Sequence, residues 1–126
     1  MQKIVLDTSV LLMPAERKLD VLEECRRLAE NCELFVLAQT IEELKSMAAR
    51  HTKKGIASRV ALQLIEKNKI PTLAANAGKA DEAMVELARK DRTIAFATND
   101  APLRRRLRDL HAKVICLKGE SRMDWC

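Results

Sequence analysis

KIVLDTSVLL, residues 3–12, is a run of isoleucine, valine and leucine residues with a single carboxylate, Asp7, in its middle. The part before Asp7 is short and rich in β-branched residues, which favours a strand buried on both faces, as in a parallel sheet covered by helices. The apolar part after Asp7 predicts a packed helix. Asp7 then follows the end of a strand, at the edge of a parallel sheet where ligands collect.

The alternation of short apolar runs and longer helical periods continues along the chain. Strands are predicted over residues 3–6, 33–37, 93–98 and 113–117, with a weaker candidate over 70–74. One helix is predicted over residues 18–30, and four more around the apolar stripes that begin at Ile41, Ile56, Met84 and Leu103. This alternation predicts an α/β fold with right-handed crossovers. Because no repeat or linker interrupts it, we expect one domain over residues 1–126.

The composition restricts the kind of partner. The 126 residues include 23 Lys and Arg against 18 Asp and Glu, a net charge of +5 that hints at a polyanionic partner. Only Phe35, Phe96 and Trp125 are aromatic, which argues against a base-stacking platform and leaves phosphate contacts to dominate. No apolar run could span a bilayer and no signal peptide is evident, so we expect a cytoplasmic protein that does not contact membranes.

The four cysteines are expected to be reduced thiols. Cys25, Cys32, Cys116 and Cys126 form no C-x-x-C pair, and the chain has only two histidines, His51 and His111. A zinc site is therefore not expected.

Acidic residues accumulate where predicted strands end and helices begin: Asp7, Glu42, Glu43, Asp81 and Asp100. Each has a structural explanation, because polar and acidic residues are the preferred caps of helices. Thr40 and Glu43 have the spacing of a capping box. Asp100 could cap the fifth helix, with Pro102 in its first turn.

Helix faces separate these acids further. Asp81 lies three and seven residues before Met84 and Ala88 and shares their inward stripe, whereas Glu82 and Glu86 do not. Glu43 adjoins Leu44, whereas Glu42 aligns with the polar face. The best-placed acids are Asp7, Glu43, Asp81 and Asp100.

Carboxylates crowded together repel one another, and Mg²⁺ or Mn²⁺ with oxygen ligands is the natural compensation. Such ions activate water and stabilise charge during phosphodiester cleavage. Without the four acids, 14 Asp and Glu remain against 23 Lys and Arg, a basic surface around an acidic cleft that suits a nuclease.

Four motifs together resemble the PIN-domain nuclease family: IVLDTSVLL (4–12), TIEELKS (40–46), ADEAMVELA (80–88) and IAFATNDAPLRRRL (94–107). The resemblance covers nearly the whole chain. It implies a three-layer α/β/α sandwich with a central parallel sheet. It also implies Mg²⁺- or Mn²⁺-dependent hydrolysis of RNA by an activated water, which leaves 5′-phosphate and 3′-hydroxyl ends. Carried over by position, the family's acidic quartet falls on Asp7, Glu43, Asp81 and Asp100, and the supporting polar residues are Thr8, Ser9, Thr98 and Asn99.

The resemblance leaves the biological role open. The segment after Thr98 resembles members related to ribosomal RNA processing, while the short single-domain length is equally typical of VapC-type toxins. The expected partner is RNA, and a second copy of the chain and an antitoxin protein are further candidates. The candidate RNA contacts are Arg104, Arg105, Arg106 and Arg108 on the fifth helix and Arg50, Lys53 and Lys54 after the second. The alternative for both clusters is a solvated charged face.

Two other classes fit less well. A response-regulator receiver would use Thr98 and Lys118, but it needs a second acid beside Asp7 and a phosphoacceptor aspartate near residues 70–79, and neither is present. A non-catalytic RNA-binding scaffold is weakened by the intact acidic quartet.

Overall fold

A six-stranded sheet with strand order β3-β2-β1-β4-β5-β6 forms the centre of the computed structural model, which describes residues 1–75 and 78–126. All neighbouring strands are parallel except β6, which runs antiparallel to β5. The strands are β1 (Lys3–Leu6), β2 (Glu33–Leu37), β3 (Thr72–Leu73), β4 (Ala95–Ala97), β5 (Lys113–Lys118) and β6 (Arg122–Trp125).

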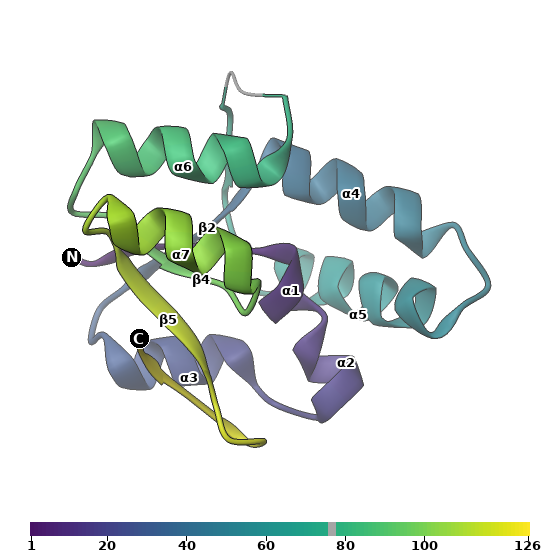
Figure 1. The fold of residues 1–126 in the computed structure, drawn as a ribbon. Helices are drawn as coiled ribbons and strands as arrows, with labels where there is room; N and C mark the ends of the chain where they lie inside the picture. Colours follow the sequence, from purple (N-terminus) through teal and green to yellow (C-terminus); the bar gives the residue numbers. More distant parts are fainter. Residues whose placement is uncertain (76–77) are drawn as a thin grey trace.

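Helices cover both faces of this sheet (Figure 1). Helices α6 and α7 lie over one face and α3 lies over the other, while α4 and α5 form a hairpin that extends beyond the strands. The helices are α1 (Thr8–Leu11), α2 (Met13–Arg17), α3 (Val21–Leu28), α4 (Ala38–Ala48), α5 (Lys53–Lys67), α6 (Ala80–Lys90) and α7 (Ala101–Asp109). No helix within the described residues is long and apolar enough to cross a membrane.

The central strand β1 has apolar side chains on both faces because two separate cores flank it. Ile4 and Leu6 belong to the core beneath α3 and α5, while Val5 packs in the core beneath α6 and α7. All three side chains are fully buried, and each contributes roughly 1.5–3 kcal/mol relative to an exposed position. The predicted three-layer α/β/α sandwich with a central parallel sheet is therefore confirmed, with β6 as the one antiparallel strand of the described sheet.

Most predicted elements form, with shorter ends. Strand β4 covers only the middle of the predicted segment 93–98, and the weak candidate at 70–74 becomes the two-residue edge strand β3, directly after Pro71. The helix predicted over 18–30 begins at Val21. It starts there because Lys18 has a left-handed backbone (φ 54°) and the Asp20 carboxylate accepts the Glu23 N–H at 3.0 Å as a cap.

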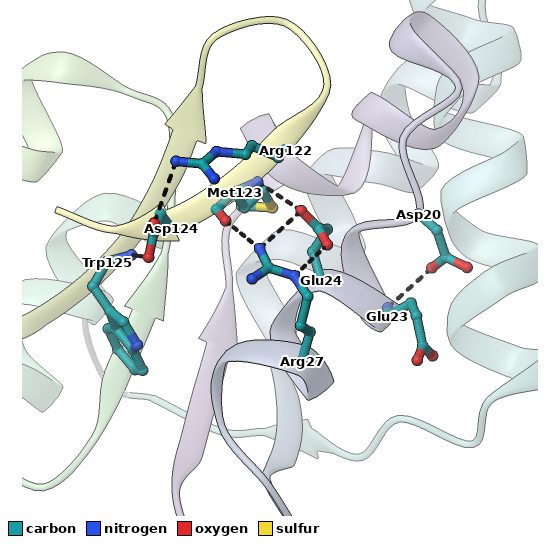
Figure 2. Close-up of polar contacts among 8 residues, drawn as sticks. All are labelled: Asp20, Glu23, Glu24, Arg27, Arg122, Met123, Asp124 and Trp125. Atoms are coloured by element: carbon teal, nitrogen blue, oxygen red, sulfur yellow. Dashed lines mark hydrogen bonds and ion pairs between the residues drawn. The ribbon is translucent and has the colours of Figure 1, made fainter.

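The C-terminal strand β6 was not predicted, and it makes the sheet mixed. It pairs antiparallel with β5, with Ile115 opposite Trp125. Two side chains of α3 fix it: the Met123 N–H donates to Glu24 Oε1 at 2.8 Å, and Arg27 Nη2 donates to the Met123 carbonyl at 2.7 Å (Figure 2). Because Met123 is the one fully buried residue of β6, the sequence carries little apolar alternation to reveal the strand.

The expectation of four reduced thiols is wrong for one pair. Cys116 of β5 and the terminal Cys126 form a disulfide, with Cα atoms 6.0 Å apart, within the usual range for such bridges. Antiparallel pairing of β6 beside β5 brings them together. Cys25 and Cys32 are free, and burial raises the pKa of the Cys25 thiol to about 12.

The capping box predicted at Thr40 and Glu43 is also wrong. Strand β2 leads directly into α4, which begins at Ala38, so Thr40 is a fully buried residue within the helix. The prediction for α7 is confirmed: Asp100 Oδ1 accepts the Leu103 N–H at 3.2 Å, with proline in the first turn.

Candidate active site

Asp7 follows β1, the strand at which the order of strand addition reverses. Successive strands after β1 are added on one side as β2 and β3, whereas β4 and β5 lie on the other side, so the loops after β1 and β4 diverge at this point. Ligands of open α/β sheets bind in the crevice at such a switch point. The Asp7 N–H donates to the Ala97 carbonyl at 2.9 Å and its carbonyl accepts the N–H groups of Val10 and Leu11, which fixes its backbone between β4 and α1.

Two hydroxyl groups hold the Asp7 carboxylate. Thr98 Oγ1 and Ser9 Oγ each donate to Asp7 Oδ2 at 2.7 Å, and the Asp7 side chain is only 8% exposed. The hydroxyls are themselves fixed by backbone donors, since the Asn99 N–H donates to Ser9 Oγ at 2.9 Å and the Asp100 N–H donates to Thr98 Oγ1 at 3.1 Å. Asp7 therefore has one orientation. The sequence offered Asp7 as a helix cap, but its carboxylate accepts no N–H group of α1.

The four predicted acids come together around one cleft of about 900 Å³, although they belong to separate segments. Asp7 follows β1, Glu43 lies on α4, Asp81 on the first turn of α6, and Asp100 at the start of α7. Asp7 is buried, whereas the other three are exposed. The parallel sheet explains this convergence, because the segments that follow its strands all leave from the same edge.

Glu42 lines the cleft as well as Glu43. Its carboxylate lies 3.9 Å from Lys45 Nζ in an exposed pair, as the polar face of α4 suggested. The two glutamates therefore both face the cleft, although the helix faces favoured Glu43 alone. Glu42 could have been predicted to line the cleft from its position directly beside Glu43 in the first half of α4.

The polar support residues have different places. Thr8 and Ser9 line the cleft, and Thr98 lies fully buried behind Asp7. The Asn99 N–H helps to hold Ser9. The buried Thr8 hydroxyl has no hydrogen-bond partner among the described residues.

The oxygen donors around the cleft fit a hydrated Mg²⁺ or Mn²⁺ ion. Carboxylates are the ligands that such hard cations prefer. In residues 1–75 and 78–126, no three acidic, histidine or cysteine side chains are close enough to enclose a metal ion. Mg²⁺ does not require such a cage, because it keeps several waters and usually takes one or two carboxylates together with substrate phosphates. The ordered Asp7 and the exposed acids around it suit this mode of binding.

Of the predicted RNA contacts, only Lys54 lines the cleft, and it is joined there by Lys79, which the sequence reasoning missed. Lys79 directly precedes α6, which carries Asp81 in its first turn. This closeness in sequence to a predicted site acid could have marked Lys79 as a cleft residue. The residues Arg50, Lys53, Arg104, Arg105, Arg106 and Arg108 lie outside the lining of the cleft. Whether they contact RNA stays a prediction.

Arg106 is already engaged with a carboxylate. Its guanidinium donates to Glu82 Oε1 at 2.7 Å and to Oε2 at 3.1 Å, linking α7 to α6. This pair raises the pKa of Arg106 and lowers the pKa of Glu82, mainly through the shared hydrogen bonds. Glu82 thus ties two helices of one layer together, in keeping with its prediction as a residue off the inward stripe.

Comparisons with known proteins agree with this geometry. The chain is 30% identical over 122 residues to ribonuclease VapC4 of Methanocaldococcus jannaschii, covering 94% of this chain and 92% of that protein. Its fold is similar to the PIN domain endonuclease Utp24, with a TM-score of 0.75 and 19% identity over 97% of this chain and 90% of the other. It is also similar to a domain of a functionally unknown M. jannaschii protein, with a TM-score of 0.68 and 16% identity over 94% and 93% of the two chains.

The sequence model described as a PIN like domain matches residues 4–120, from the second residue of β1 to just beyond the end of β5. The match contains every acid around the cleft. The chain belongs to the PIN-like domain family.

Proposed function

We propose that the protein is an endoribonuclease that uses Mg²⁺ or Mn²⁺ bound in the cleft, with Asp7 as a direct ligand and with Glu43, Asp81 and Asp100 binding the cation directly or through its waters. The observation that carries this proposal is the convergence of carboxylates from four separate segments on one cleft at the switch point of the sheet. Hydrolysis of RNA is supported by the identity to a ribonuclease over most of both chains.

The residues of the chain have distinct parts in this proposal. Asp7 is the rigid ligand, because the Thr98 and Ser9 hydroxyls fix one of its oxygens and leave the carboxylate no freedom to turn. Glu43, Asp81 and Asp100 extend from exposed helix turns, where they can adjust to the cation and to the phosphate. A divalent cation bound here supplies a nucleophile at neutral pH and stabilises the charge that develops on the phosphodiester. Water would attack phosphorus and leave 5′-phosphate and 3′-hydroxyl ends.

The sequence relation favours a role as a VapC-type toxin over a role in ribosomal RNA processing. The similarity to ribonuclease VapC4 is a sequence similarity over nearly the whole chain, whereas the similarity to Utp24 at 19% identity concerns the fold. A toxin of this type acts on cellular RNA in the cytoplasm and is neutralised by an antitoxin. The corresponding test is growth arrest on expression of the chain, relieved by co-expression of a small upstream gene. Growth unaffected by expression of an active nuclease would favour the processing role.

The activity itself is tested with labelled RNAs of varied structure, incubated with Mg²⁺, Mn²⁺ or EDTA. We expect cleavage by the wild-type protein with either cation, none with EDTA, and products that carry 5′-phosphates. Asp7→Asn should bind RNA and leave it intact. Equal cleavage by the two proteins would contradict the proposal, as would wild-type protein that cuts none of the RNAs with any divalent cation.

Cation binding can be measured independently of cleavage. An ion that binds only the folded state raises the melting temperature, by the equivalent of about 2.7 kcal/mol at a hundred times its dissociation constant. We expect Mn²⁺ to raise the melting temperature of the wild-type protein and to have a much smaller effect on Asp7→Asn.

A further inference from the structure

Two lysines, Lys54 and Lys79, are the only cationic side chains among the described residues that line the cleft. They come from different elements: Lys54 is in the first turn of α5, and Lys79 is the residue before α6. Neither forms an ion pair within the described part of the chain, in contrast to Arg106, which Glu82 engages. Both ammonium groups are therefore available to an anion in the cleft.

The two lysines lie at opposite ends of α4. Lys54 adjoins Gly55, which packs so tightly on the last turn of α4 that an added Cβ would meet the Met47 carbonyl at 3.0 Å and the Arg50 carbonyl closer still. At the other end, Gln39 Nε2 in the first turn of α4 donates to the Ala75 carbonyl at 2.9 Å, and α6, which begins directly after Lys79, contacts α4.

Glu42 and Glu43 lie between these two ends. From Gln39 to Met47, α4 rises by roughly 12 Å, more than the length of one phosphodiester group. The two lysines therefore enter the cleft from backbone positions at different ends of α4.

The charge of the cleft makes these lysines significant. Its lining carries five carboxylates and two ammonium groups, a formal net charge of −3, so a polyanion is repelled unless cations compensate. A divalent cation bound by the acids offsets their negative charge only near the phosphodiester bond that is cut. Phosphates on either side of that bond need another positive charge, and the lysines are placed to provide it.

The positions of the lysines also work against stability. The N-terminal end of a helix carries partial positive charge, so a cation in its first turn or at its cap is unfavourable by electrostatics. Lys54 and Lys79 both occupy such positions, at the starts of α5 and α6. A purely structural role therefore does not explain their presence.

We propose that Lys54 and Lys79 form a two-sided phosphate clamp that holds one RNA strand across the acids, with a phosphate bound on each side of the bond that is cut. This inference rests on the proposed ribonuclease function and defines its substrate as a single strand extending in both directions from the cut. A flexible single strand suits this arrangement because Asp7 is the one buried carboxylate among the described acids that line the cleft. Phosphate contacts carry no direct sequence information, so the clamp itself tolerates different base sequences.

The binding test uses 5′-fluorescein-labelled oligo(U) of twelve nucleotides and fluorescence anisotropy with Mg²⁺ present, in the Asp7→Asn background so that the RNA stays intact. Lys54→Gln and Lys79→Gln should each weaken binding by about threefold to tenfold. Each should also reduce the slope of log affinity against log salt by about 0.7, the contribution of one phosphate contact on a single strand. Lys67→Gln and Lys90→Gln, at the far ends of the same two helices, are the matched controls and should bind like the parent.

The cleavage test uses oligo(U) chains of two to eight nucleotides with the wild-type protein. The rate should rise steeply once a chain carries phosphates on both sides of the cut, and the double variant Lys54→Gln/Lys79→Gln should lose most of this dependence on length. Melting temperatures of the lysine variants should not fall, because a cation is removed from each helix N-terminus.

The outcomes separate this inference from the proposed function. Wild-type protein that binds oligo(U) through the two lysines but cuts no RNA overturns the proposed function alone. Wild-type protein that cuts, with Lys54 and Lys79 variants equal to the Lys67 and Lys90 controls, overturns the clamp alone. Absence of any binding to oligo(U), both by the Asp7→Asn parent and by the wild-type protein with Mg²⁺, also overturns the clamp.

Discussion

Carboxylates in two regions of the molecule differ in whether they have an ion-pair partner. At the junction of α3 and β6, Glu24 accepts hydrogen bonds from Arg27 Nε at 2.9 Å and from the Met123 N–H at 2.8 Å (Figure 2). Around the cleft, none of Asp7, Glu43, Asp81 and Asp100 forms an ion pair within the described residues. The first arrangement pairs a half-buried carboxylate with a guanidinium, and the second leaves four carboxylates without an ion-pair partner in the described part of the chain.

The difference separates stability from function. The Glu24 pair joins the last strand to a helix, so its charge contributes to the fold. Acids without an ion-pair partner that face one cleft repel one another. Places where local stability is given up in a consistent fold are expected to be functional sites. The two regions should therefore respond in opposite ways to the loss of one negative charge.

The largest effect is expected from Asp7→Asn. The amide keeps the size of the side chain and still accepts a hydroxyl hydrogen bond, but it is a poor cation ligand. We expect RNA cleavage to fall by at least about 100-fold, since loss of residues that merely support metal ligands already costs 10–100-fold. The matched control is Asp124→Asn on β6, an acid paired with Arg122 at 3.7 Å, which should cut RNA at the wild-type rate.

Thr98→Val tests whether the orientation of Asp7 matters as well as its charge. The change removes the hydroxyl that donates to Asp7 and accepts from the Asp100 N–H. We expect cleavage to fall by about 10–100-fold, and the free energy of unfolding to fall by about 1–3 kcal/mol because a buried carboxylate and an N–H lose a partner. Kinetics and urea denaturation measure the two effects. Thr93→Val, an exposed threonine that bonds Asp91, is the control, and a similar loss of activity there would contradict the assignment.

The pair Glu43→Gln and Glu42→Gln decides which glutamate of α4 belongs with the acids. Both line the cleft, but Glu42 also faces Lys45. We expect Glu43→Gln to reduce cleavage at least about tenfold and Glu42→Gln to reduce it less than about threefold, by analogy with ligand and supporting positions in metal sites. The reverse order in steady-state assays would transfer the role to Glu42.

The smallest effect is expected at the paired carboxylate. Glu24→Gln should leave cleavage unchanged and lower the free energy of unfolding by about 1 kcal/mol. The Arg27 hydrogen bond, followed by that of the Met123 N–H, holds the pKa of Glu24 below its ordinary value of 4.5. A carboxyl with a lowered pKa in the folded state stabilises the protein above pH 4.5 and loses this contribution as the pH falls through its folded value.

The stability difference between wild type and Glu24→Gln should therefore be present at pH 7 and narrow progressively below pH 4.5. Urea denaturation at several pH values measures it. A difference that is independent of pH would show that the charge of Glu24 is not what holds β6.

Elements with strong local signals were predicted well. Strands β1 and β2 match their predicted ranges because each is apolar on both faces, a pattern that depends on the buried sheet. The Asp100 cap was predicted because the aspartate and the following proline are local features of a helix start. The four acids could be chosen because parallel strands send their loops to one edge.

Features that depend on distant partners were missed. Strand β6 exists because β5 offers an unpaired edge and because Glu24 and Arg27, almost a hundred residues earlier, hold Met123. The Cys116–Cys126 disulfide follows from that pairing. The capping box failed because β2 runs straight into α4, two residues before the local cap signal.

The sequence by itself determined the central strand, its two apolar faces and the single carboxylate at its end, since these depend on residue type and periodicity. Tertiary structure decided what surrounds that carboxylate. It placed Thr98 behind Asp7, Lys79 and Lys54 at the two ends of α4, and β6 against α3, because each of these contacts joins segments that no local pattern connects. Ten residues were enough to predict Asp7 as a site residue, whereas the lining of its cleft depends on segments that follow several strands of the sheet.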